Sequence, residues 1–197
     1  MDTVKVGAMI ARLRKERGMT QKELADALGI SNKTVSKWER GWGCPDLSLW
    51  PELSALLGAD MSGMMAGAMP ANRPDSGNLS RGRFYVCPTC RGMLFSTGEA
   101  SIFCCGRKLE PLEPSGQVAE EDIQVEHTDA DPYVTLRHPM TKDHFLAFAA
   151  YVTGDRVWFH RLYPEQEAAF HLPSLARGRL YVYCTRHGLL RCPDLRR

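Results

Sequence analysis

The sequence predicts a multidomain α + β protein, in which a helical segment precedes a β-rich region. Three observations support this fold class. Apolar residues recur at helical spacing through residue 66. A stretch rich in Gly, Pro, Ala, Asn and Ser follows at 67–82, has no apolar periodicity and is typical of a linker. From Arg83 onward, short apolar runs such as FYV, SIF, YVTL and RLYVYC alternate with turn residues, as β-strands do.

Length and composition narrow the class of protein. A chain of 197 residues has room for two or three small domains. Its 44% hydrophobic and 24% charged residues are those of an ordinary soluble protein. No apolar run approaches the roughly 20 residues that cross a bilayer, and the first residues lack the features of a signal peptide. We therefore expect a cytoplasmic protein without membrane contact, in which seven cysteines are metal ligands or redox groups rather than disulfides.

The helical segment contains clear start and stop signals. Val6, Ile10 and Leu13 have helical spacing and are followed by Gly18, a typical C-terminal cap. Thr20 and Glu23 form the pattern of a capping box for a second helix, which Gly29 ends. We expect a third helix capped by Ser31, with Val35 and Trp38 facing inward. A fourth is expected over 46–57, with one apolar side made of Leu49, Leu53 and Leu56, and a short turn at 61–65.

The second and third of these helices have the pattern of a helix-turn-helix. Over residues 20–41, TQKELADALGISNKTVSKWERG, Ala25 is small enough for two helices to cross closely, and Ile30 and Val35 fix their angle. The outward side chains are all of types that contact base edges and phosphates: Ser31, Asn32, Lys33, Thr34, Ser36 and Lys37. Nine Lys and Arg against five acids through Pro45 suit a phosphate backbone. The alternative is a small helical bundle whose polar helix is only solvated.

This segment closely resembles the Cro/phage-repressor class of helix-turn-helix domains in its TQxELA, GIS and VSxWERG elements. The resemblance implies a five-helix domain over residues 1–66 that binds double-stranded DNA as a homodimer, at inverted half-sites about one turn apart. It also implies that Gln21 and Lys37 touch phosphates, while Asn32, Lys33 and Thr34 read bases. Trp38 and Glu39 are interpreted as scaffold.

Four cysteines predict a first metal site. Cys87 and Cys90 form a CxxC knuckle, and Cys104 and Cys105 follow after thirteen residues. Four thiolates make a tetrahedral site for zinc or iron, which the adjacent pair should distort; the alternative is four thiols without metal. The pattern YVCPTC…FCCGRKLEPL resembles desulforedoxin, the module that opens desulfoferrodoxins. The resemblance implies a small rubredoxin-like module over 83–113 with mononuclear iron, although zinc binds the same ligands.

A second group combines three imidazoles with a thiolate: His138 and His144 in HPMTKDH, and Cys184 and His187 in YCTRHG. These residue types together predict an iron or zinc site. The elements HPMxxxH, FLAFAAYV and YCxxHG resemble superoxide reductase, the domain that follows desulforedoxin in desulfoferrodoxins. This resemblance implies an Ig-like β-sandwich over 114–197, in which ferrous iron has three equatorial histidines from this group and Cys184 as its axial ligand.

One element departs from that family. Where the enzymes carry Glu-Lys-His, this chain has Glu120, Glu121 and Asp122. Asp122 could still bind iron, but Glu121 would repel superoxide where a lysine attracts it. His127 is a possible substitute ligand. We interpret four further residues as structural or surface groups: His160, His171, Cys44 and Cys192.

Three functions remain open from the sequence. The leading hypothesis is a sequence-specific transcription regulator whose metal region senses redox state, reactive oxygen or metal supply and changes the spacing of the two DNA-binding domains. The second is a superoxide reductase that carries a DNA-binding domain. The third gives the metal domains a purely structural role in dimerisation or partner contact.

Overall fold

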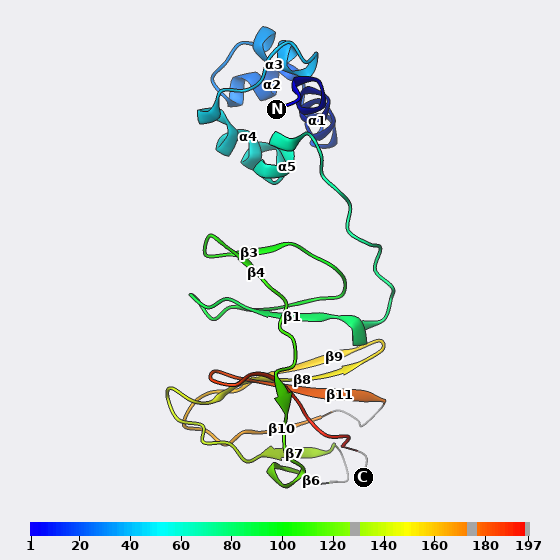
Figure 1. Cartoon of the computed structure of the whole chain (residues 1–197), viewed down its shortest axis with the longest axis vertical. Helices are drawn as coiled ribbons and strands as arrows, with labels where there is room; N and C mark the ends of the chain where they lie inside the picture. The colour runs from blue at the N-terminus through cyan, green and yellow to red at the C-terminus, as the bar shows by residue number, and fades with distance from the viewer. Residues whose placement is uncertain (127–130, 173–176, 196–197) are drawn as a thin grey trace. The chain divides into compact units, whose positions relative to one another are not determined.

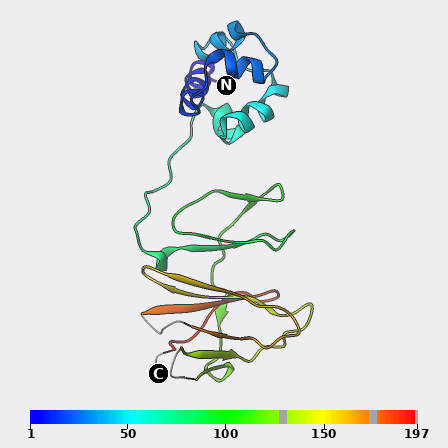
Figure 2. The same ribbon diagram turned by 180° about the vertical axis from the view of Figure 1, so that it is seen from behind.

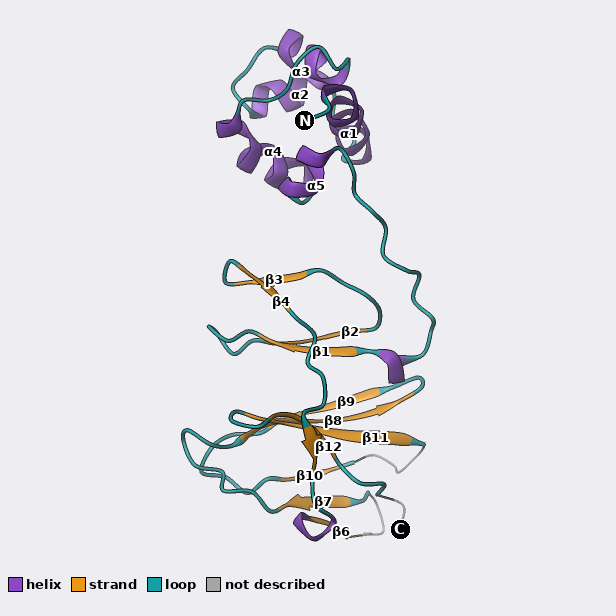
Figure 3. Ribbon diagram, viewed as in Figure 1, coloured by secondary structure: helices purple, strands orange, loops and turns teal. Residues whose placement is uncertain are grey.

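The computed structural model describes residues 1–126, 131–172 and 177–195 of the chain and divides into two compact units (Figure 1). The first unit is Met1–Ala71 and the second is Asn72–Arg197. All α-helices of the described residues belong to the first unit, and all strands belong to the second (Figure 3). Among these residues, no helix is long and apolar enough to cross a membrane.

The first unit consists of short helices with well-formed ends: α1 (Thr3–Glu16), α2 (Gln21–Ala27), α3 (Asn32–Glu39), a 3-10 turn (Leu47–Leu49), α4 (Trp50–Leu57) and α5 (Met61–Ala66). The predicted capping box is present, because Thr20 and Glu23 bond each other's backbone N–H groups. Ser31 caps α3 as expected. Gly18 and Gly29 follow α1 and α2 with φ of 68° and 64°, a conformation that side chains with a Cβ rarely adopt.

The expected fourth helix is wrong at its start, whereas its predicted apolar side does face the core. Residues 47–49 form a 3-10 turn and the α-helix begins at Trp50. Pro51 has no N–H to donate to the carbonyl of residue 47, so an α-helix cannot run continuously through this point. The side chains that reach the core are Trp50, Leu53 and Leu57, whereas Leu49 and Leu56 are only partly buried.

The described residues of the second unit form four small sheets. Two are hairpins: β1 (Arg83–Val86) with β2 (Met93–Ser96), and β3 (Ile102–Cys104) with β4 (Arg107–Leu109). A three-stranded sheet has the order β10 (Ala169–His171), β7 (Tyr133–Leu136), β6 (Ile123–Glu126). A five-stranded sheet has the order β5 (Gly116–Gln117), β12 (Gly188–Arg191), β11 (Gly178–Cys184), β8 (Leu146–Thr153), β9 (Val157–Arg161). All pairings are antiparallel except β5 with β12.

Strand β8 is buried on both faces along its whole length. One face, with Ala149 and Tyr151, packs into a core shared with Val134 and Phe170 of the three-stranded sheet. The other face, with Phe148 and Val152, packs against the β1–β2 hairpin. The two views in Figures 1 and 2 show this order of layers within the second unit. The run FLAFAAYV is continuously apolar because neither face meets water.

The end of the predicted linker packs on the second unit. Residues Leu79–Arg81 form a 3-10 turn, in which the Leu79 N–H donates to the Gly154 carbonyl at 2.9 Å. The Leu79 side chain lies against the apolar layer between the β1–β2 hairpin and β8. At Gly82 any Cβ would overlap the Phe95 ring, so only glycine fits this close approach. The division between the two compact units lies at residues 71–72, within the predicted linker of 67–82.

Candidate functional sites

The helix-turn-helix is formed by α2 and α3, which cross where Ala25 is almost fully buried. Val35 and Trp38 face the core, as predicted. Asn32, Lys33 and Lys37 are exposed, and Thr34 and Ser36 are half-buried beside them. The Ser31 hydroxyl accepts the Thr34 N–H at 3.2 Å and lies 2.8 Å from the Thr34 hydroxyl, so both hydroxyls already belong to the helix cap. The side chains most available to a ligand are therefore Asn32, Lys33 and Lys37.

Glu39 joins all three helices around this motif. Its carboxylate accepts two hydrogen bonds from the Arg14 guanidinium, at 2.6 and 2.9 Å, and one from the Gln21 amide at 2.7 Å. The Arg14 and Glu39 side chains are only 9% and 8% exposed. Burial alone would raise the pKa of Glu39, but the hydrogen bonds from Arg14 and Gln21 outweigh it and hold the pKa below its ordinary value. Glu39 is thus part of the scaffold, and one Gln21 amide proton is engaged inside the protein.

Arg40 and Trp42 are exposed next to the C-terminus of α3, and the sequence analysis did not identify them. The Trp42 ring is 69% exposed, and the Arg40 guanidinium lies 4.0 Å from its centre. The Trp42 N–H donates to the Lys37 carbonyl at 2.9 Å, and Gly41 has φ of 77°. This closed turn fixes the position of an aromatic ring beside the Arg40 guanidinium. The signal available in the sequence was an aromatic residue between two glycines without an apolar partner.

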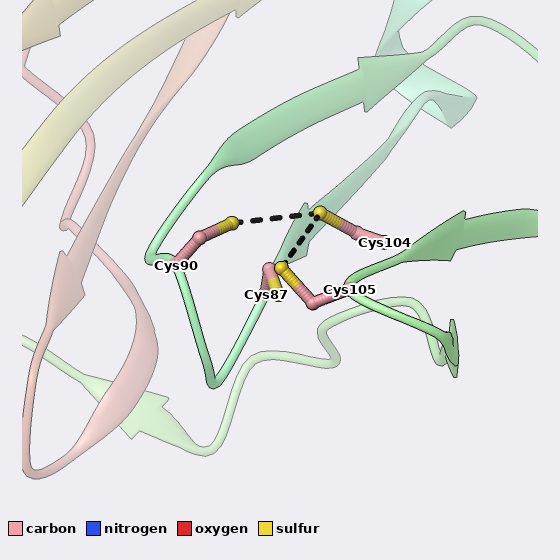
Figure 4. Close-up of side chains that lie close together, drawn as sticks. All are labelled: Cys87, Cys90, Cys104 and Cys105. Atoms are coloured by element: carbon pink, nitrogen blue, oxygen red, sulfur yellow. Dashed lines mark hydrogen bonds between the residues drawn. The ribbon is translucent and has the colours of Figure 1, made fainter.

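The four predicted cysteines lie together at the ends of the two hairpins of the second unit (Figure 4). Their sulfur atoms all lie within 4.8 Å of one another, with Cys90 and Cys104 at 3.5 Å and Cys104 and Cys105 at 4.0 Å. A zinc ion with bonds of 2.3 Å to a tetrahedron of sulfurs would place these atoms about 3.8 Å apart. Cys105 has φ of 49°, which turns its thiol back toward the group despite its adjacency to Cys104. The residues therefore fit a tetrahedral metal ion.

The charges of these thiols lead to the same conclusion. The backbone N–H of Cys90, with that of Thr89, lowers the pKa of Cys87 to about 6 against the opposing effect of burial. The neighbouring thiols of Cys90 and Cys87 raise the pKa of Cys104 to about 12. One thiolate thus forms readily, and like-charge repulsion opposes the next. A cation at the centre removes this repulsion, which is why a thiolate group of this kind favours a metal ion.

The second predicted group also comes together, at one end of the five-stranded sheet. His138 follows β7, His144 precedes β8, Cys184 ends β11 and His187 lies in the β11–β12 turn. One ligand atom from each of the four residues lies within 4.8 Å of the others. The His144 ring centre is 4.6 Å from that of His138 and 4.8 Å from that of His187, both in edge-on arrangements.

Backbone hydrogen bonds beyond the last β8–β11 strand pair fix this arrangement. The Thr185 N–H donates to the Phe145 carbonyl at 3.0 Å, and the Phe145 N–H donates to the Thr185 hydroxyl at 3.2 Å. The strand register pairs Cys184 with Leu146, and the ligand atoms of His144 and Cys184 lie within 4.8 Å of each other. Ser115 bonds the His187 carbonyl and fixes the turn from a third segment. The sequence showed the four ligand types, but only this pairing brings them to one point.

Three properties of the group suit a metal ion. His144 Nε2 is buried and has no hydrogen-bond partner among the described residues, as expected of an atom placed to bind a metal. Burial, together with the nearby His144 and His187, lowers the pKa of His138 to about 4, so the imidazole is neutral near pH 7. The Arg186 N–H donates toward the Cys184 sulfur at 3.4 Å. His138 Nε2 lies 3.4 Å from the same sulfur.

Two residues were considered as a further ligand of this group. Asp122 lies outside the four-residue group among the described residues, and His127 is outside the residues that the structure describes. His160 stacks on Phe170 with ring centres 5.0 Å apart. The His171 ring packs on Tyr133 at 4.7 Å.

The remaining two cysteines are packed thiols, as interpreted from the sequence. Cys192 is buried in the shared core of the second unit, where burial raises its pKa to about 12. Cys44 packs against the core of the first unit.

The approach to His138 is acidic. A cavity of about 340 Å³ is lined by His138 together with Glu121, Asp122 and Glu167, and Arg137 is the cation among its lining residues. A lysine in place of Glu121 would attract an anion, whereas three carboxylates repel one. The departure seen in the sequence at residues 120–122 therefore gives a cavity beside the histidine group whose charge opposes superoxide.

Comparisons with known proteins agree with both halves of this description. The Helix-turn-helix family model matches residues 10–63. The uncharacterized HTH-type transcriptional regulator y4dJ of Sinorhizobium fredii is 42% identical over 53 residues, which cover 27% of this chain and 69% of that protein. Desulfoferrodoxin of Clostridium acetobutylicum is 24% identical over 109 residues, covering 49% of this chain and 83% of the relative.

Solved structures include the superoxide reductase from Treponema pallidum, which aligns with a TM-score of 0.47 and 19% identity and covers 56% of this chain and 96% of that one. The clp gene regulator ClgR from Corynebacterium glutamicum aligns at a TM-score of 0.32 with 27% identity, covering 34% of this chain and 71% of that one. The family model and the sequence relatives, rather than the solved structures, establish the family of the chain. It belongs to the helix-turn-helix family of transcriptional regulators, and the region behind its helix-turn-helix domain is related to desulfoferrodoxin.

Proposed function

We propose that the chain is a sequence-specific DNA-binding regulator whose C-terminal region binds metal and controls the DNA-binding domain. The observation that carries the DNA-binding part is the surface of α3, where Asn32, Lys33 and Lys37 are exposed on a helix whose other side is buried. Asn32, Lys33 and Thr34 read base edges, and Lys37 with the free amide proton of Gln21 contacts phosphates. A homodimer places two such helices in successive major grooves.

Arg40 and Trp42 extend this surface. A cation and an aromatic ring fixed beside the C-terminus of α3 suit the sugar-phosphate backbone that flanks a major-groove site. Their contribution is to affinity rather than to sequence selection, because they contact no base edge from this position. Trp42→Ala is expected to weaken binding to operator and random DNA by similar factors, unlike Lys33→Ala. Titration of both duplexes by fluorescence anisotropy separates the two effects, and a loss confined to the operator would contradict this role.

The C-terminal region supplies two metal centres in this proposal. Cys87, Cys90, Cys104 and Cys105 hold iron or zinc, and His138, His144, Cys184 and His187 hold iron. A bound iron ion would supply one-electron redox chemistry. The chain's own contribution is to keep the imidazoles neutral, to hold the Cys184 thiolate and to fix both groups to an Ig-like sandwich. Oxidation or loss of metal then changes the packing of this region, which alters the spacing of the two DNA-binding domains.

One experiment tests the two parts together. Protein purified without oxygen is assayed for metal content, visible spectrum and operator affinity in oxidised, reduced and metal-free forms. We expect metal at both groups, a thiolate-iron band lost in Cys184→Ser, and a change in operator affinity with redox state. Equal affinity in all three forms would refute metal control while leaving DNA binding intact. Failure of Lys33→Ala and Asn32→Ala to change operator selection would refute the assignment of α3.

The second candidate function is superoxide reduction. The observation that favours it is the meeting of three histidines and Cys184 at one point. The acidic cavity beside His138 weighs against it, because Glu121, Asp122 and Glu167 oppose the approach of an anion. Pulse radiolysis of the reduced protein decides between them. Rapid consumption of superoxide that disappears in Cys184→Ser would establish the enzyme; slow consumption that Glu121→Lys accelerates would support the regulator and the electrostatic argument.

A further inference from the structure

A second cavity in the β-rich unit is lined mainly by positively charged side chains, in contrast to the acidic cavity beside His138. It measures about 380 Å³, within the range of small-ligand sites, and is lined by the β1–β2 hairpin on one side and by the five-stranded sheet and its loops on the other. Arg91, Lys142 and Arg161 line it with a single carboxylate, Asp143. Neither the DNA-binding surface nor the two metal groups accounts for these cations.

Among the described residues, the guanidinium groups of Arg91 and Arg161 have no carboxylate partner. Neither arginine forms a salt bridge within this part of the chain, and the Arg161 guanidinium contacts the Met93 sulfur at 3.6 Å. Lys142 lies 3.8 Å from Glu165, but both side chains are more than 60% exposed, so this pair is weak. Three exposed cations thus line one cavity with a single carboxylate, and this charge balance favours an anion there.

The walls of the cavity are rigid and include polar groups. Arg91 follows the Cys87–Cys90 knuckle with φ of 58°, and its N–H donates to the Cys87 carbonyl at 2.9 Å. The Tyr183 ring stacks on Phe148 at 5.5 Å with an angle of 8° between the planes. Burial raises the pKa of Tyr183, so its hydroxyl remains a hydrogen-bond donor at neutral pH. The Thr185 hydroxyl also lines the cavity.

We propose that this cavity binds a small organic anion through carboxylate or phosphate groups, with Arg91 and Arg161 as the two guanidinium clamps and Lys142 at the rim. Guanidinium groups suit both kinds of oxyanion because they donate parallel hydrogen bonds. A bound anion would connect the hairpin that carries Cys87 and Cys90 to the loop that carries His144. The regulatory consequence rests on the proposed function, whereas binding itself does not.

Isothermal titration calorimetry of the metal-loaded full chain tests the site, with inorganic phosphate and succinate as separate probes at constant ionic strength set by chloride. We expect at least one probe to bind one-to-one, and Arg91→Gln and Arg161→Gln each to weaken it at least tenfold. Arg107→Gln, an exposed arginine of the same module that does not line the cavity, is the control and should bind as the wild type does.

Lys142→Gln keeps the test valid if an arginine variant folds poorly, since this side chain is 76% exposed. It should weaken the probe about threefold without a change in metal content or far-UV circular dichroism. Binding of phosphate alone or of succinate alone supports the site and identifies the preferred group. Absence of binding by both probes, or unchanged binding in all three variants, would overturn the proposal. No DNA is present in this assay, so its outcome is independent of the DNA-binding function.

Discussion

Removing the buried Glu39 carboxylate should destabilise the helix-turn-helix unit more than removing a solvent-exposed charge from the same unit. The side chain joins α3 to α1 through Arg14 and to α2 through Gln21. In Glu39→Ala the Arg14 guanidinium loses its counter-ion while it stays only 9% exposed. One further bond, from Arg14 to the Met19 carbonyl at 2.6 Å, remains but does not neutralise the charge.

The magnitude follows from the burial of this pair. Breaking a buried ion pair by removing one partner costs about 3–5 kcal/mol, and the hydrogen bond from Gln21 is lost in addition. We expect the lower part of this range, about 3 kcal/mol, because water reaches the edge of the pair. A unit of 71 residues has a free energy of unfolding of about 4–10 kcal/mol, so the variant would lose a large share of it. The corresponding drop in Tm is roughly 10–25 °C.

Urea denaturation of the full chain followed by far-UV circular dichroism measures this loss selectively, because all α-helices of the described residues lie in the first unit. Glu16→Ala is the matched control: its carboxylate lies 3.5 Å from Arg12, but both side chains are more than half exposed. The control should cost less than about 0.5 kcal/mol. Glu39→Gln, which keeps an acceptor but no charge, should fall between the two.

Two results would refute the reasoning. A loss in Glu39→Ala no larger than in Glu16→Ala would mean that the carboxylate is not a structural link between the helices. A loss of bound metal in the same variant would mean that the two units do not fold independently. The double variant Arg14→Ala/Glu39→Ala should cost less than the sum of the single variants, because the unpaired charge is removed.

Three further predictions address the functional sites. Lys37→Ala should lower DNA affinity for all sequences and reduce the slope of log K against log salt by about one for each half-site. Fluorescence anisotropy between about 50 and 200 mM salt measures this slope. An unchanged slope would contradict the phosphate contact of Lys37. Chelation of metal under reducing conditions, or Cys87→Ser, should abolish hydrogen-exchange protection of the β3–β4 hairpin, whereas α1–α5 should keep theirs. The reason is that a module with few apolar residues depends on its metal for stability. Full protection of the hairpin without metal would contradict this. The metal-free second unit should lose stability as pH falls from about 6.5 toward 4, because the pKa of His138 is lowered to about 4 in the folded state and the unfolded chain binds the proton first. The loss, at most about 2 kcal/mol for a partly exposed ring, is read from hydrogen exchange of β8 and β11 in urea and should be smaller in His138→Gln.

Much of the local structure was readable from single residues. Thr20, Glu23 and Ser31 begin helices because their side chains bond free N–H groups, and Gly18 and Gly29 end them because they adopt positive φ. Such signals act within one turn of chain and need no partner. The strands that the sequence identified are those with continuous or alternating apolar runs, including β7 at 133–136 and β8 at 146–153. The short strands β5 and β10 carry no such run and form only because a neighbour offers its backbone.

The ligand types of both metal groups were also visible in the sequence, because thiols and imidazoles with those spacings are rarely needed for packing. The sequence alone therefore determined the helical unit, the change to strands, and which residues could bind DNA or metal. Tertiary structure decided what depends on distant segments meeting: Glu39 and Gln21 bonding each other across helices, His144 held beside Cys184 by the β8–β11 pairing, and two cavities of opposite charge. Contacts of this kind arise from burial and strand pairing over many residues, which no local pattern encodes.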